Sequence, residues 1–133
     1  MQLEKVRRIL DAKVITGEQH MDMEIQMGCG SDLMSDVLAF IKEDTLLLTG
    51  LTTIQVVYTA EMSGIKAICF VRGKVPPEET KRLAESKEIV LLSTDLPMFE
   101  SCGKLYHEGI KGCSQTEFKK NKNNGAGRRK WKK

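Results

Sequence analysis

Nine residues with anion-binding chemistry fall into three short segments, 49–53, 72–74 and 93–94, and each segment follows an apolar run. The candidate residues are Thr49, Gly50, Thr52, Thr53, Arg72, Gly73, Lys74, Ser93 and Thr94. Main-chain N–H groups, hydroxyl groups and basic side chains all donate hydrogen bonds to phosphate or carboxylate oxygens. If the fold brings the three segments together, they would suit a small anionic or nucleotide-like ligand.

The apolar runs before these segments predict strands of a parallel sheet. Residues 46–48, 68–71 and 89–92 are continuously apolar, which is typical of strands covered on both faces. Between the first two, segment 54–62 has helical spacing, with a threonine to cap its start and Gly64 to end it. Two parallel strands joined by a helix place the turns after the strands at the carboxyl edge of the sheet. We therefore expect the nine candidates to line this edge.

The rest of the chain continues the alternation of strand and helix. Further helices are expected at about 2–11, 31–42, 76–87 and 97–109, and further strands at 13–16 and 23–27. In the second of these helices, the residues expected to face inward are Leu33, Val37, Leu38 and Ile41. Gly28 and Gly30 are interpreted as a tight turn, with an anion cradle as the alternative. The pattern predicts an α/β fold, a single three-layer domain with a mostly parallel central sheet flanked by helices.

A change in composition near residue 115 predicts two parts. Residues 1–114 are expected to form the α/β domain, and residues 115–133 a basic tail that is disordered in isolation. From Phe118 onward the tail has eight basic residues and no acidic ones, whereas the whole chain carries a net charge of +3, so the domain is acidic on balance. The basic residues around Trp131 suit a solubilising tail, an acidic protein partner or weak nucleic-acid binding.

Motifs of catalysis and of metal binding are missing from the sequence. It contains neither a P-loop nor a G-x-S-x-G motif, and its four cysteines and two histidines lack metal-site spacing, so no cofactor or metal is expected. Asp95 follows a strand end and is interpreted as capping a turn, with a general base as the alternative. Asp32 and Asp36 are interpreted as favourable charges at a helix start. We therefore expect a chain that is not an enzyme.

Neither a membrane span nor a signal peptide is expected. No apolar run approaches the length needed to cross a bilayer, and the first residues lack the apolar centre of a signal peptide. The expected location is cytoplasmic.

Four segments occur in an order that resembles the DRTGG domain family: VITGEQHMD, GCGSDLMSDVLAFI, TLLLTGLTTIQVVYTAEMSGIKAICFVRGKVPPEE and IVLLSTDLPMFE. The resemblance covers about residues 6–110 and is greatest to short stand-alone members, some of which are encoded near iron-only hydrogenases. It implies a fold similar to the N-terminal domain of HPr kinase/phosphorylase, a homodimer, and no established catalytic activity.

This chain departs from the family pattern at the residues that give the family its name. Residues 50–52 read Gly-Leu-Thr in place of Gly-Asp-Arg, and residues 71–73 read Val-Arg-Gly in place of Thr-Gly-Gly. The two glycines remain, but the acid–base pair is absent, so no ligand contact through that pair is expected. The sequence predicts a non-catalytic regulatory or ligand-binding module that acts as a homodimer. The alternatives are a scaffold whose tail docks on a redox or signalling partner, and a weak nucleic-acid binder.

Overall fold

The computed structural model describes residues 1–40 and 43–112, in which strands and helices alternate. The helices are α1 (Leu3–Leu10), the 3-10 helix η1 (Glu18–His20), α2 (Met34–Phe40), α3 (Ile54–Ser63), α4 (Glu78–Ser86) and α5 (Met98–His107). The strands are β1 (Lys13–Thr16), β2 (Met27–Gly30), β3 (Thr45–Thr49), β4 (Ala67–Phe70), β5 (Val90–Ser93) and β6 (Lys111–Gly112). The predicted tail at 115–133 lies outside the described residues. Across the described part of the chain, no helix is long and apolar enough to cross a membrane.

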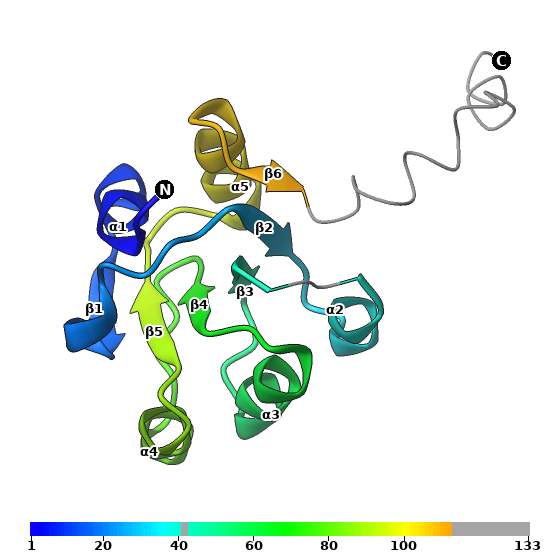
Figure 1. The fold of residues 1–133 in the computed structure, drawn as a ribbon. Coiled ribbons are helices and arrows are strands. Elements are labelled where there is room, and N and C mark those ends of the chain that lie inside the picture. The colour runs from blue at the N-terminus through cyan, green and yellow to red at the C-terminus, as the bar shows by residue number, and fades with distance from the viewer. Residues whose placement is uncertain (41–42, 113–133) are drawn as a thin grey trace, which may run out of the picture.

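The strands form one sheet in the spatial order β1-β5-β4-β3-β2-β6 (Figure 1). β1 runs antiparallel to β5, and every other neighbouring pair is parallel. In the centre, Leu47 lies opposite Ile68, and Ile68 lies opposite Leu91. The prediction that the three apolar runs lie side by side and point the same way is therefore confirmed.

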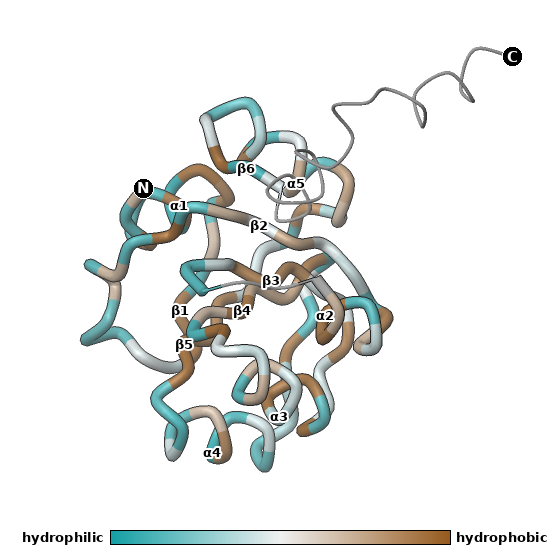
Figure 2. Tube along the Cα trace, turned by 45° about the vertical axis from the view of Figure 1, so that its right-hand side comes forward, coloured by the Kyte–Doolittle hydropathy of each residue, from teal (hydrophilic) through white to brown (hydrophobic). Residues whose placement is uncertain are grey.

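Helices cover both faces of this sheet, with α1 and α5 on one face and α2, α3 and α4 on the other (Figure 1). Successive side chains of β3 alternate between the two cores. Leu46 and Leu48 pack in the core with Leu105 of α5, whereas Leu47 packs with Val57 of α3. Because both faces are buried, the central strands are apolar at successive positions, and β3, β4 and β5 are brown in the middle of Figure 2. The predicted three-layer α/β architecture is confirmed.

The position of β2 corrects two sequence predictions. The strand occupies Met27–Gly30 and not 23–27, so Gly28 and Gly30 are strand residues and not a turn. Glycine is needed here because α5 packs closely against the strand. A Cβ at Gly30 would lie only 2.7 Å from the Sγ atom of Cys102. The glycines therefore mark a close approach between a strand and a helix.

The inward face of α2 is also partly corrected. Met34 and Val37 are buried, but the side chains of Leu33 and Leu38 are 58% and 47% exposed. Ile41, the last residue expected to face inward, lies outside the described residues. Since α2 lies over the margin of the sheet, beside β3 and β2, one turn of it contacts the core and its outer side chains do not (Figure 1).

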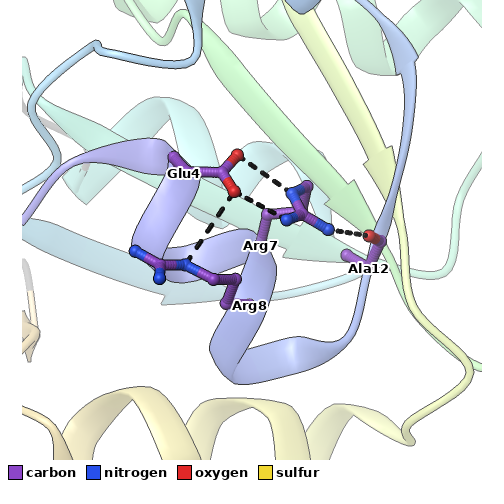
Figure 3. Close-up of polar contacts among 4 residues, drawn as sticks. All are labelled: Glu4, Arg7, Arg8 and Ala12. Atoms are coloured by element: carbon purple, nitrogen blue, oxygen red, sulfur yellow. Dashed lines mark hydrogen bonds and ion pairs between the residues drawn. The ribbon is translucent and has the colours of Figure 1, made fainter.

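A charged cluster fixes the end of α1 against the chain that leads into β1 (Figure 3). The Arg7 guanidinium donates two hydrogen bonds to the Glu4 carboxylate, at 3.0 and 2.6 Å, and a third to the Ala12 carbonyl at 3.4 Å. Arg8 Nε lies 3.8 Å from the same carboxylate. The hydrogen bonds from Arg7 lower the pKa of Glu4. The cluster thereby positions the first residue of β1, Lys13, at the carboxyl edge.

Candidate functional site

The turns after β3, β4 and β5 meet at the carboxyl edge of the sheet and are joined by main-chain hydrogen bonds. The N–H of Val71 donates to the Thr49 carbonyl at 3.1 Å, which joins the first two turns. The N–H of Gly73 donates to the Thr94 carbonyl at 2.8 Å, which joins the last two. The structure therefore brings the three segments singled out in the sequence to one edge.

Two of the predicted hydroxyl groups are used inside the structure. Thr94 is buried, and its Oγ1 donates a 2.6 Å hydrogen bond to the Leu10 carbonyl at the end of α1. The Oγ of Ser93 donates to the Lys74 carbonyl at 2.8 Å. These two hydroxyls bond to main-chain carbonyls of the protein, so they shape the turns at the carboxyl edge.

The turn after β4 presents two positive side chains. Arg72 and Gly73 have φ angles of 61° and 69°, in the left-handed region that disfavours side chains with a Cβ. A Cβ at Gly73 would also lie 3.1 Å from Oδ1 of Asp95, an exposed side chain, so the positive φ is the main reason for glycine here. The N–H of Arg72 donates to the Leu96 carbonyl at 2.9 Å. Arg72 and Lys74 are exposed, and neither forms an ion pair with any residue of the described ranges.

The start of α3 offers main-chain donors without a side-chain cap. Thr53 is the N-cap residue, is exposed, and makes no side-chain hydrogen bond to the helix. The carbonyl of Thr52 accepts a 2.8 Å hydrogen bond from the buried Thr80 of α4. The first turn of a helix carries N–H groups that lack partners within the helix, and such groups attract anions.

Asp32 belongs to the site but was missed in the sequence. Its Oδ1 accepts hydrogen bonds from the Thr49 hydroxyl at 2.9 Å and from the Gly50 N–H at 2.7 Å. From the sequence alone, Asp32 is expected to act as a favourable charge at a helix start. The missed signal was its place two residues after β2, a parallel neighbour of β3, so that its side chain reaches the same edge.

A cavity of about 380 Å³ lies beside the turn after β4 and has both signs of charge in its lining. The lining residues are Asp11, Lys13, Val14, Ile15, Gly73, Val75, Lys81, Ser93 and Asp95. Only Gly73 and Ser93 were among the nine candidates. Lys13 was missed because the sequence does not give the direction of β1. Since β1 is antiparallel, its first residue lies opposite Ser93 at the carboxyl edge.

A second cavity, of about 310 Å³, lies between α5 and the strands β2 and β6, and its lining is largely apolar. The lining residues are Gly28, Gly30, Leu48, Phe99, Cys102, Gly103, Leu105, Tyr106, Ile110, Lys111 and Gly112. Burial raises the pKa of the Cys102 thiol, which favours its protonated form. This cavity suits apolar groups and not anions.

The carboxyl edge combines several groups that can bind an anion. Within residues 1–40 and 43–112, no group of three or more histidine, cysteine, aspartate or glutamate side chains is placed to hold a metal ion. The candidate base Asp95 is exposed and lies close to the Gly73 turn. The carboxyl edge therefore combines cations, main-chain donors and a few carboxylates, a combination that suits a polar anion.

Comparison with known proteins agrees with this fold. No match is found among curated proteins. Among solved structures, the chain is similar to the CBS and DRTGG domains of the regulatory region of Clostridium perfringens pyrophosphatase, complexed with the activator diadenosine tetraphosphate. The two are 14% identical with a TM-score of 0.66, over 85% of this chain and 48% of that one, so this chain spans about half of that chain's length. The DRTGG domain model matches residues 5–107. The chain therefore belongs to the DRTGG domain family, as its sequence motifs implied.

Proposed function

We propose that this chain is a non-catalytic regulatory module that binds a small anionic, nucleotide-like ligand at the carboxyl edge of its sheet. One observation carries the proposal. The turns after β3, β4 and β5 are hydrogen-bonded to one another, and the exposed Arg72 and Lys74 beside them have no ion-pair partner among the described residues. Cations held next to fixed main-chain donors form strong, charge-assisted hydrogen bonds with phosphate oxygens.

The mixed-charge cavity gives such a ligand room and a second set of contacts. Its volume of about 380 Å³ falls within the range usual for small-molecule sites. Lys13 and Lys81 could pair with phosphate oxygens there. Asp11 and Asp95 could accept hydrogen bonds from sugar hydroxyl groups, as carboxylates do in nucleotide sites of α/β folds.

The structural relative suggests the first ligand to test. That pyrophosphatase regulatory region is complexed with diadenosine tetraphosphate, a dinucleotide with a chain of phosphates. At 14% identity the likeness concerns the fold, so we propose for this chain the same class of ligand and not the same compound.

We also propose that the module works as a homodimer. The supporting feature is a pair of aromatic side chains on α5, Phe99 at 87% and Tyr106 at 67% exposure, which both line the apolar cavity. Large exposed aromatic groups around an apolar hollow are typical of surfaces that another chain covers. Sedimentation equilibrium of Phe99→Ser with Tyr106→Ser should give a monomer, whereas an unchanged dimer, or a monomeric wild type, would remove this part of the proposal.

Isothermal titration calorimetry with diadenosine tetraphosphate, ADP and inorganic pyrophosphate tests the ligand site. Arg72→Gln removes the positive charge and leaves a shorter, neutral polar side chain, so it should weaken binding about tenfold. Arg82→Gln is the matched control, since Arg82 is an exposed arginine within α4 and does not belong to the turns after β3, β4 and β5. Chromatography of the ligand after incubation should recover it intact. No binding by any of the three compounds, or equal binding by Arg72→Gln and the wild type, would contradict the proposal.

A further inference from the structure

The Asp32 carboxylate accepts hydrogen bonds from two donors of the turn after β3, at the carboxyl edge of the sheet. Oδ1 of Asp32 lies 2.7 Å from the main-chain nitrogen of Gly50 and 2.9 Å from the hydroxyl of Thr49. A phosphate oxygen bound to the turn after β3 would need the same two donors. We propose that Asp32 is an internal competitor, which a bound anion must displace from Gly50 and Thr49.

The two sides of this contact differ in how firmly the fold holds them. Thr49 is fully buried, is the last residue of β3 and lies in register with Phe70 of β4, and Gly50 follows it directly, so both donors are held at the end of the sheet. Asp32 is exposed and lies in the bend between β2 and α2. The bend itself is anchored one residue earlier, where the Ser31 N–H donates to the Leu48 carbonyl at 3.0 Å. Rotation of the Asp32 side chain is therefore enough to vacate the donors, with no change in the sheet.

Displacement of Asp32 would connect the ligand to α2. The residue lies two positions before the first residue of α2, Met34, and Val37 of that helix packs in the same core as Val57 of α3. A bound anion would release the side chain that joins the bend to the turn after β3. The bend and the exposed Leu33 beside it could then move without unpacking the core. This inference rests on the proposed function for the natural ligand, but the competition itself can be measured with a simple anion.

The test compares Asp32→Ala with Asp36→Ala in titrations with inorganic pyrophosphate. Calorimetry measures the affinity, and the amide resonance of Gly50 reports whether the anion reaches this donor. Asp36 is an exposed aspartate of α2 and controls for the loss of one negative charge. If Asp32 covers the donors nearly all the time, its removal should tighten pyrophosphate binding about tenfold or more, because only the uncovered fraction can bind. The Gly50 amide should shift on titration in Asp32→Ala, and Asp36→Ala should match the wild type.

Equal pyrophosphate affinity in Asp32→Ala and Asp36→Ala, or a Gly50 amide that does not respond, overturns the inference. That result would leave the proposed function standing if the wild type binds diadenosine tetraphosphate through Arg72. Conversely, a gain in Asp32→Ala together with equal binding by Arg72→Gln and the wild type supports the inference and removes the proposed function. If Asp32→Ala does not fold, the same titrations are compared between Asp32→Asn and Asp36→Asn. A neutral and weaker acceptor should still raise the affinity, and no gain overturns the inference.

Discussion

The hydroxyl of Thr94 donates a 2.6 Å hydrogen bond to the main-chain carbonyl of Leu10, which joins the end of β5 to the end of α1. Both residues are buried, at 1% and 0% exposure. The last carbonyls of a helix have no partner within the helix, so this hydroxyl satisfies one of them. The same hydroxyl accepts a hydrogen bond from the Leu96 N–H at 3.3 Å and so shapes the loop beside the Gly73 turn.

Replacing Thr94 with valine keeps the shape of the side chain and removes the donor. A buried carbonyl that loses its partner costs about 1–3 kcal/mol, so the free energy of unfolding should fall by that amount. Thr53→Val is the matched control, because Thr53 is exposed and makes no cap hydrogen bond, and it should change stability by less than about 0.5 kcal/mol. Urea denaturation measures both. Equal stability of the two variants would show that the Thr94 hydrogen bond contributes little.

The close approach of β2 and α5 predicts opposite effects of alanine at two glycines. At Gly30 a Cβ would meet Sγ of Cys102 at 2.7 Å, so Gly30→Ala should destabilise the fold by about 1–3 kcal/mol. At Gly103, within α5, nothing lies within 4 Å of an added Cβ, so Gly103→Ala should stabilise the helix by up to about 1 kcal/mol. Adding Cys102→Ala to Gly30→Ala should restore part of the loss. A Gly30→Ala variant as stable as the wild type would contradict the close packing.

The contact between Glu4 and Arg7 predicts a dependence of stability on pH. Hydrogen bonding to Arg7 lowers the pKa of Glu4 below its ordinary value of 4.5 in the folded state. The contribution is therefore present above the ordinary pKa and is lost as the pH falls through the lowered one. The difference in melting temperature between the wild type and Glu4→Gln should be largest near pH 7 and should shrink as the solution is acidified. The difference in melting temperature between the wild type and Arg7→Gln should also shrink on acidification. A difference that grows as the pH falls would contradict the predicted pKa shift of Glu4.

The Cys69 thiol should be unreactive in the folded protein. Burial in β4 raises its pKa to about 12, so the reactive thiolate is scarce at neutral and mildly basic pH. Mass spectrometry after iodoacetamide treatment at pH 8 should find Cys69 unmodified in the native state and modified in urea. Fast native labelling at Cys69 would mean that β4 is open to solvent, contrary to its central place in the sheet.

The sequence predicted the centre of the fold well because burial on both faces leaves a direct pattern. Three continuous apolar runs could only be strands between two helical layers, and they are β3, β4 and β5. The strand β2 was misplaced because glycine has no preference for strands. A Cβ at Gly30 would meet Cys102 of α5, and a Cβ at Gly28 would lie 3.2 Å from Ile110, contacts that local sequence does not carry.

The helix α3 illustrates a similar limit. Segment 54–62 was recognised as a helix, but its buried side is formed by Val56, Val57 and Ala60, whereas Met62 is 72% exposed. The helical spacing of Ile54, Val57, Tyr58 and Met62 indicates a different inward face, and of these four only Val57 is buried.

Part of the candidate site could be predicted from the sequence, because the order of strands and helices alone brings some segments together. Turns that follow parallel strands meet at one edge whatever their side chains, so the segments containing Gly50 and Gly73 were found. Asp32 and Lys13 were not, because their place depends on the position of β2 and on the direction of β1.

Binding at the carboxyl edge is tested most directly by recording ¹⁵N–¹H spectra while diadenosine tetraphosphate is added. Amide shifts concentrated at the turns after the three central strands, at Gly50, Thr53, Gly73 and Lys74, are the result we predict. Shifts concentrated at Gly103 and Tyr106 beside the apolar cavity, or spectra that do not change, would contradict a ligand site at this edge.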